Sequence, residues 1–326
     1  MTEVEPVGTG AGIGAQTRMI PLDAPVDLRA VLGPLMRGTG DPTMRVAAGA
    51  AIRASETPEG PGTIEMRVVG ASILASAWGP GAAWLLEALP AALGLDDDDT
   101  GFDPKLHPVV ADLARRLGPV RLGRTGAVWE ALLPAILEQR ITGTEARRNY
   151  RRLVLAHGTP APGPHGLHVA PPPQVVGGLP SWTLTGLGIE PRRGALLRRI
   201  SREAPRWERI GVASLAQGAG GRGAADLAAA MQANSGIGPW TAAEVTLRAL
   251  GDPDAVSVAD AHLSNVVAFA LKGEARGTDE RMLELLAPWP GHRARVVRLL
   301  ERSGITPPRY GPRVAPRDIS RELRRR

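Results

Sequence analysis

The chain of 326 residues contains no cysteine and few aromatic side chains. Without cysteine the protein has no disulfides, thiolate zinc sites, cysteine nucleophiles or thiolate-held iron–sulfur clusters. Phe, Trp and Tyr together make up 3% of the residues, and lysine occurs only at Lys105 and Lys272. The lack of cysteine fits a reducing compartment, so we expect a cytoplasmic protein.

Long uninterrupted apolar runs are also missing. Residues 1–18 include two glutamates and a glycine-rich run without a hydrophobic core, which is unlike a secretory signal and predicts a flexible tail. The most apolar stretch, residues 71–95, is broken by Gly79, Pro80 and Pro90. It is therefore too interrupted to span a bilayer, and we expect no membrane segment.

Positive charge is in excess. The formal net charge is +6 and the sequence pI is about 10.7, almost entirely from arginine. Such an excess of positive charge favours partners that carry phosphate. A general bias of the composition towards arginine would give the same excess without a functional cause. With 43% hydrophobic residues the chain is long enough to form two well-buried domains.

The periodicity of apolar residues changes along the chain. Residues 19–100 mix alternating runs, such as 63–69, with helical runs, and predict a small α/β domain. The acidic run 96–99 marks a boundary, and residues 101–312 are almost entirely helical in pattern, with one Pro/Gly-rich loop over 159–178. The expected fold class is mainly α, a small N-terminal α/β domain followed by an all-helical domain. Residues 313–326 form an Arg-rich tail that lies over the surface or is disordered.

The expected helices of the larger domain lie at residues 105–117, 127–141, 144–157, 192–204, 224–233, 240–250, 260–271, 279–287 and 292–303.

A short glycine-rich connection joins two of these helices. It consists of Ser235, Gly236, Ile237, Gly238 and Pro239. The glycines can adopt positive φ and let a phosphate approach the backbone, while Ile237 fills the space between the helices. The helix that starts near Trp240 offers free N–H groups and a positive dipole end to a phosphate. The segment is either a plain helical hairpin or a sequence-independent contact to nucleic acid.

The hairpin resembles that of the helix-hairpin-helix DNA glycosylase superfamily, in which Leu-Pro-Gly-(Ile or Val)-Gly precedes a helix. Asn234 and Ser235 depart from the usual Leu-Pro pair, whereas Gly236 to Gly238 match. The resemblance implies a helix-hairpin-helix glycosylase domain that binds double-stranded DNA through Ser235, Gly236, Ile237 and Gly238.

A single aspartate after the second hairpin helix extends this resemblance. In the superfamily an extended segment leads to one Asp at the start of the next helix, and Asp260 matches that position. An isolated Asp there would be interpreted as a helix cap, and the two roles can coexist. The resemblance implies that Asp260 is the catalytic carboxylate, which stabilises positive charge on the sugar as the N-glycosidic bond breaks.

The residue after Pro239 indicates the branch of the superfamily. Members with lyase activity carry a Lys there, whereas this chain carries Trp240. Trp240 within the run GIGPWTA is similar to the bacterial inducible 3-methyladenine DNA glycosylase family, where it lines the base pocket. An indole can stack on a flipped cationic base, and the less favoured alternative is that Trp240 is a core residue. The similarity implies a monofunctional DNA-3-methyladenine glycosylase that excises alkylated bases in base excision repair.

Other candidates follow from the same similarity. Gln139 or Arg140, after the helix that precedes them, would fill the gap left by the flipped base. Glu244 replaces a second pocket aromatic and would either attract a cationic base or lie in solvent. Trp289 is either a remaining pocket wall or a packing residue.

Some expectations concern partners and cofactors. We expect no protein metal site and no cofactor, apart from a monovalent cation that the resemblance implies at the hairpin. We also expect a monomer that acts on nucleoid DNA. The alternative functions are a non-catalytic helix-hairpin-helix protein that binds DNA or lesions, and a glycosylase for a neutral damaged base.

Overall fold

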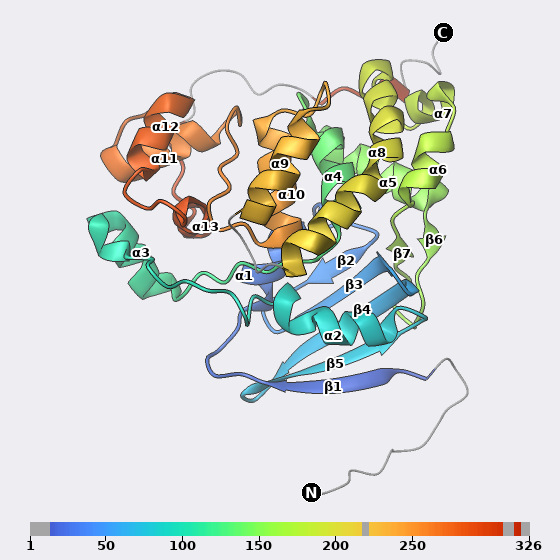
Figure 1. Ribbon diagram of the computed structural model, residues 1–326, viewed down its shortest axis with the longest axis horizontal. Helices are drawn as coiled ribbons and strands as arrows, with labels where there is room; N and C mark the ends of the chain where they lie inside the picture. The colour runs from blue at the N-terminus through green and yellow to red at the C-terminus, as the bar shows by residue number, and fades with distance from the viewer. Residues whose placement is uncertain (1–13, 217–221, 309–315, 321–326) are drawn as a thin grey trace, which may run out of the picture.

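The computed structural model describes residues 14–216, 222–308 and 316–320 (Figure 1). Near the N-terminus a five-stranded antiparallel sheet has the order β1-β5-β4-β3-β2. Its strands are β1 (Gln16–Pro21), β2 (Met44–Val46), β3 (Ala50–Thr57), β4 (Gly60–Val69) and β5 (Ser72–Trp78). Alternate side chains of β5, including Ile73, Ala75 and Ala77, are buried, as expected for a sheet with one covered face.

Short helices complete this N-terminal unit. They are α1 (Leu28–Leu32), η1 (Gly33–Leu35) and α2 (Ala82–Ala92). Leu85 and Leu89 of α2 are buried in the same core cluster as the apolar residues of the sheet. The expected tail over residues 1–18 is too long, because β1 begins at Gln16 and pairs with β5, while residues 1–13 lie outside the described residues.

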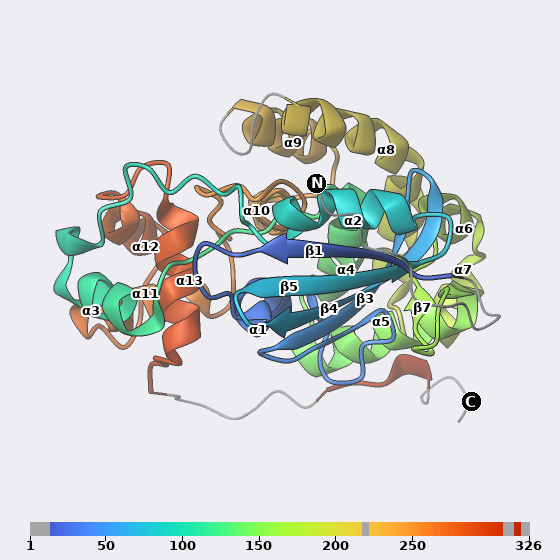
Figure 2. The ribbon, with the colours of Figure 1, turned by 90° about the horizontal axis from the view of Figure 1, so that it is seen from below.

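The helical part contains two hydrophobic core clusters. The first is built by α4 (Val128–Glu138), α5 (Gly143–His157), α6 (Pro173–Gly178), α7 (Ser181–Gly186), α8 (Pro191–Ala216), α9 (Arg222–Gln232) and α10 (Pro239–Leu250). The second is built by α3 (Pro108–Leu117), α11 (Leu263–Lys272), α12 (Asp279–Leu286) and α13 (Arg293–Ser303). Figure 2 shows the sheet in front of α4, with α3 and α11 to α13 grouped to one side. A mainly helical fold with a small sheet was expected from the sequence and is confirmed.

Two expectations about local structure were wrong. The helix expected to end at residue 204 continues through Pro205 to Ala216. A proline inside a helix costs one backbone hydrogen bond, but the fully buried Ala204 and Trp207 hold this helix against the first core cluster. The loop expected over residues 159–178 contains a two-stranded pair, β6 (Thr159–Pro160) and β7 (His168–Val169), followed by α6.

Part of the Arg-rich C-terminus packs on α5. Asp318 accepts hydrogen bonds from both Nη atoms of Arg152, at 3.0 Å each, and Ser320 is buried. Residues 313–315 and 321–326 of that predicted tail lie outside the described residues. Within the part of the chain that the structure describes, no helix combines the length and apolar character needed to cross a membrane.

Candidate active site

The hairpin between α9 and α10 has the geometry expected of a phosphate-binding turn. Gly236 has φ +87°, which a glycine adopts without steric cost, and Ile237 is buried in the first core cluster. Gly238 precedes α10, and no side chain caps that helix. The first N–H groups of α10 therefore have neither a helical nor a side-chain partner, and they can donate to a phosphate.

Side chains from two other helices hold the carbonyl groups of the hairpin. Gln139 Nε2 donates to Gly236 O and to Thr241 Oγ1, each at 3.0 Å. Arg199 of α8 donates to the carbonyl of Ser235. These bonds engage the carbonyl groups of Gly236 and Ser235, and the first N–H groups of α10 remain for a ligand.

These contacts bear on the monovalent cation implied by the family resemblance. Such an ion would be coordinated by the same hairpin carbonyl groups. The guanidinium of Arg199 already lies against the Ser235 carbonyl, and a second cation there would be repelled. The residues present therefore do not fit a bound cation at this carbonyl.

The two candidates for filling the gap in DNA have different environments. The side chain of Gln139 is bonded to the hairpin, and its backbone carbonyl accepts a bond of 2.8 Å from the buried Arg193. Arg140 follows it, is exposed, and has φ +55°, a left-handed conformation that costs a non-glycine residue about 1–2 kcal/mol. Of the two, Arg140 has the side chain available to enter a duplex.

Asp260 and Trp240 meet directly. Trp240, in the first turn of α10, donates from its indole Nε1 to Asp260 Oδ2 at 3.0 Å. Asp260 Oδ1 accepts from the N–H groups of His262 and Leu263, at 2.8 and 2.9 Å, so the same carboxylate also caps the start of α11. Both groups are only partly buried. The structure thus places an ionisable carboxylate beside an accessible indole, immediately after the hairpin.

The backbone just before Asp260 is strained. Ala259 has φ +69°, and its N–H donates to Asp279 Oδ2 at 2.9 Å. A left-handed non-glycine residue persists only where its surroundings impose it, and here Asp279 at the start of α12 supplies one such contact. Asp279 was not predicted from the sequence, because nothing in the local pattern links it to residue 259.

Glu244 lies neither in solvent nor free in a pocket. Its carboxylate pairs with Arg248 at 2.6 Å and accepts a bond of 2.6 Å from Ser257 Oγ. Burial would raise the pKa of Glu244, but the charge of Arg248 and the bond from Ser257 outweigh burial, and the pKa is lowered. The charge of Glu244 therefore serves to hold the segment that leads to Asp260, and does not face an open base site.

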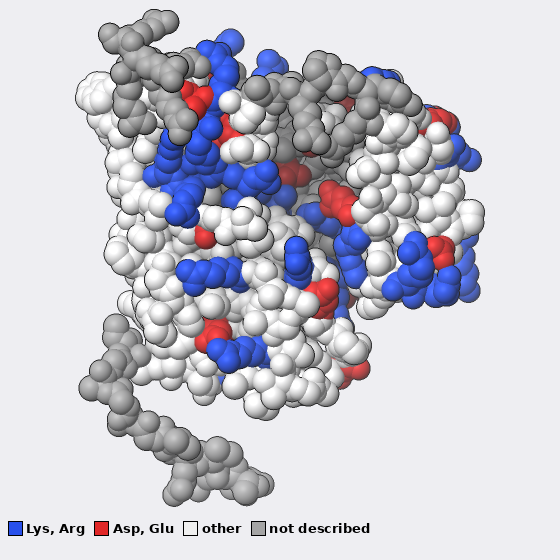
Figure 3. All heavy atoms as spheres, turned by 180° about the vertical axis from the view of Figure 1, so that it is seen from behind, with Lys and Arg blue, Asp and Glu red and all other residues white. Residues whose placement is uncertain are grey.

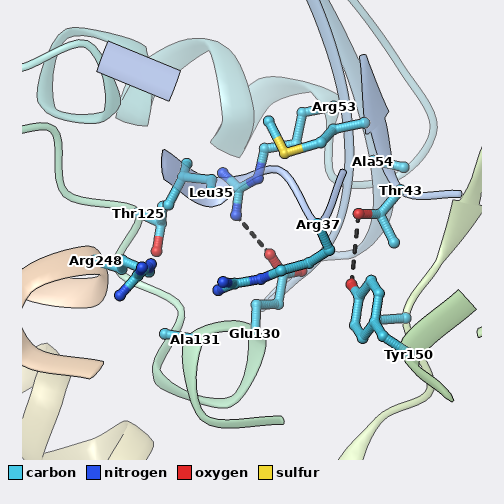
Figure 4. A pocket seen from close by; sticks show the side chains of 12 residues that line it. Leu35, Arg37, Thr43, Arg53, Ala54, Thr125, Glu130, Ala131, Tyr150 and Arg248 are labelled. Atoms are coloured by element: carbon cyan, nitrogen blue, oxygen red, sulfur yellow. Dashed lines mark hydrogen bonds and ion pairs between the residues drawn. The ribbon is translucent and has the colours of Figure 1, made fainter. Parts of the chain in front are cut away.

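Arg248 continues this network towards the N-terminal unit. Its Nε donates to the carbonyl of Pro34 at 3.2 Å, and its side chain borders a small cavity of about 30 Å³ between the sheet and α4 (Figure 4). In the same cavity Arg53 of β3 pairs with Glu130 of α4 at 2.5 Å. Polar side chains in this cavity contact one another, Arg53 with Glu130 and Thr43 with Tyr150, so we assign it to packing between the sheet and the helices.

Trp289 is placed in the second core cluster. It is 2% exposed, and its Nε1 donates to the carbonyl of Asp103 at 2.8 Å. Trp240, by contrast, packs against the first cluster. Of the two alternatives given by the sequence, the structure favours the packing role for Trp289.

The sequence matches no protein-family model and no curated protein. The fold matches a 3-methyladenine DNA glycosylase from Archaeoglobus fulgidus with a TM-score of 0.71 and 19% identity, over 88% of this chain and 98% of that one.

A second match is the 8-oxoguanine glycosylase/lyase of Clostridium acetobutylicum. Its apo form aligns with a TM-score of 0.67 and 11% identity, over 89% of this chain and 98% of that one. Its complex with double-stranded DNA containing cytosine opposite 8-oxoG aligns with a TM-score of 0.65 and 11% identity, over 90% and 98%. At such identities the likeness establishes the fold, which this chain shares with DNA glycosylases of two different specificities.

Proposed function

We propose that this protein is a monofunctional DNA glycosylase that excises alkylated bases from double-stranded DNA. The observation that carries the proposal is the 3.0 Å bond between Trp240 Nε1 and Asp260 Oδ2, directly after a turn built to bind phosphate. The fold shared with known DNA glycosylases supports the general class.

The geometry supports a division of labour among these residues. The N–H groups at the start of α10 bind a phosphate of the damaged strand, and Arg140 occupies the space that the flipped base leaves in the duplex. The base stacks on the indole of Trp240. Asp260 then stabilises the positive charge that develops on the sugar as the N-glycosidic bond lengthens, and orients the water that attacks it.

Two features support simple hydrolysis over a lyase reaction. Trp240 occupies the position at which the resemblance would require a lysine nucleophile. Lys272 is the last residue of α11, so it lies about 14 Å along that helix from its start beside Asp260. Lys272 is therefore not assigned to attack the sugar.

The choice of alkylated bases rests on their chemistry. A purine alkylated at N3 or N7 is cationic, which already weakens its glycosidic bond and favours stacking on an electron-rich indole. A neutral damaged base would need side chains that recognise it through hydrogen bonds. Glu244 is not available for this, because its carboxylate is engaged by Arg248 and Ser257.

Incubation with methylated duplex DNA tests the proposal. We expect chromatography to detect free 3-methyladenine or 7-methylguanine, and strands to break only after alkali treatment. Strand breaks without alkali would contradict the monofunctional mechanism. Release of 8-oxoguanine or hypoxanthine in preference to methylated purines would contradict the substrate class.

A further inference from the structure

The longest helix carries an unusual row of positive charge. One face of α8, a helix of 26 residues, is buried and includes Leu197, Ala204 and Trp207. The solvent-exposed side carries five exposed arginines, Arg192, Arg199, Arg202, Arg206 and Arg209. They follow one another at intervals of seven, three, four and three residues, which keeps them on one side of an α-helix. We call these five residues the arginine stripe.

The charges of the arginine stripe are not neutralised within the described part of the protein. Arg192, Arg202, Arg206 and Arg209 make no ion pair or side-chain hydrogen bond among the described residues, and Glu203, which lies beside the stripe, makes no ion pair with them either. Like charges three and four residues apart weaken a helix. Repulsion within the stripe therefore lowers the stability of the protein on its own. No contact of Arg192, Arg202, Arg206 or Arg209 among the described residues compensates for it.

The arginines of α5 provide a contrast. Arg152 pairs with Asp318, Arg151 donates to the carbonyl of Gly40, and Arg148 donates to the carbonyl of Arg317. Basic residues gather on this face in Figure 3. These internal contacts explain Arg148, Arg151 and Arg152 by folding, whereas Arg147 of the same helix has no such partner among the described residues.

The stripe is continuous with the hairpin. Arg199 belongs to the stripe and also donates to the carbonyl of Ser235, and the side chain of Leu196 lies against Gly236. In Figure 1, α8 runs alongside α9 and away from the hairpin end of that helix. From Arg192 to Arg209 the stripe is about 25 Å long, which equals about seven base pairs of B-form duplex.

We propose that the arginine stripe binds the phosphate backbone of the duplex arm that extends from the hairpin, as a second contact that is independent of sequence. The proposal rests on the proposed function only in taking DNA as the partner. Guanidinium groups suit phosphate because they donate two parallel hydrogen bonds and stay charged. The extra contact lengthens the footprint on DNA without adding a residue to the chemistry.

The test compares duplexes of different length. The affinity of the full chain is measured against salt concentration for a duplex of about 10 base pairs and for duplexes extended on either side of the lesion by about 15 base pairs. The variant carries Arg→Gln at positions 192, 202, 206 and 209. On one of the long duplexes we expect the slope of log K against log salt to fall by about three to four relative to the wild type. On the short duplex, which reaches only about five base pairs from the lesion, we expect the slope to fall by less.

Two control proteins make the result specific. One replaces Arg29, Arg67, Arg115 and Arg116, which are exposed on other elements, and loses the same net charge. We expect it to retain the wild-type slope on every duplex. The other carries Arg→Lys at positions 192, 202, 206 and 209, and we expect it to recover most of the slope. Circular dichroism should show that the Gln variant stays folded.

Some outcomes would overturn the proposal. The stripe is not a DNA contact if the Gln variant keeps the wild-type slope on both long duplexes, or if the control variant loses as much slope as the stripe variant. Failure of the proposed function has a different result, since wild-type protein would then bind DNA with a length-dependent slope but release no base from any duplex.

Discussion

The hairpin and the segment that carries Asp260 are held in opposite ways. In the hairpin, the side chains of Gln139 and Arg199 donate to backbone carbonyl groups, and the first N–H groups of α10 have no helical or side-chain partner. At Asp260 the side chain accepts from backbone N–H groups and from the indole of Trp240. Under the proposed function, the hairpin binds an anionic phosphate and the Asp260 region stabilises a developing cation, which are the two charges of a nucleotide losing its base.

The two regions also differ in the origin of their backbone shape. The positive φ of the hairpin lies at Gly236, where the residue type allows it. The positive φ beside the carboxylate lies at Ala259, where Asp279 and the packing of α11 and α12 impose it. The hairpin is therefore a local motif, whereas the carboxylate position is a product of tertiary contacts.

The largest effect is expected from Asp260→Asn, which removes the charge from one region and leaves the other intact. Base release should fall by at least about a hundredfold, because the stabilisation of the cationic sugar is lost. Affinity for DNA should be retained, since Asn still caps a helix. Single-turnover base release and anisotropy binding measure the two effects. Full base release by this variant would favour a non-catalytic role for Asp260.

The second largest effect is expected on the stability of the protein, when the ion pair that supports the Asp260 segment is broken. Glu244→Gln leaves Arg248 without its ion partner in a mostly buried position, and unfolding in urea at neutral pH should show a loss of about 3 kcal/mol. Glu301→Gln is the control, because the pair of Glu301 with Arg298 is more exposed and should contribute less than about 1 kcal/mol.

The same pair predicts a dependence on pH. The pKa of Glu244 is lowered in the folded protein, so its stabilising effect is complete above the unfolded pKa of about 4.3 and declines as the pH falls through the folded pKa. The difference in stability between wild type and Glu244→Gln should therefore shrink in acid. A difference that grows as the pH falls would contradict the assignment of a charged pair.

The smallest effects compare Gly236 and Ala259, the positive-φ residues of the hairpin and of the carboxylate segment. Gly236→Ala should destabilise the protein by about 1–2 kcal/mol, because the added Cβ meets Leu196 at 2.8 Å and φ is positive. Ala259→Gly should change stability by less than about 1 kcal/mol, and in the stabilising direction, since glycine relieves the strain. Thermal unfolding measures both. Equal losses in the two variants would remove the distinction between a local and an imposed turn.

Particular residues show which features the sequence predicted correctly and which it did not. The spacing of apolar residues and the glycines predicted the helices around the hairpin and the start of α10 within a few residues, because these features depend on neighbours in the chain. Pro205 misled the prediction of the end of α8, since the cost of a proline was outweighed by the burial of Trp207. Arg199, Asp279 and Ser257 were not predicted as part of the site, and their partners lie 13 to 36 residues away.

The amino-acid sequence by itself determined the hairpin, the helix that follows it and the presence of a carboxylate at the start of α11, because glycine conformation, helix capping and hydrophobic periodicity act over a few residues. Only the tertiary structure decided that Trp240 and Asp260 are in contact, that Glu244 supports Ser257, and that Trp289 is a core residue. Such contacts join elements from two core clusters, and their geometry depends on how whole helices pack, which no local pattern specifies.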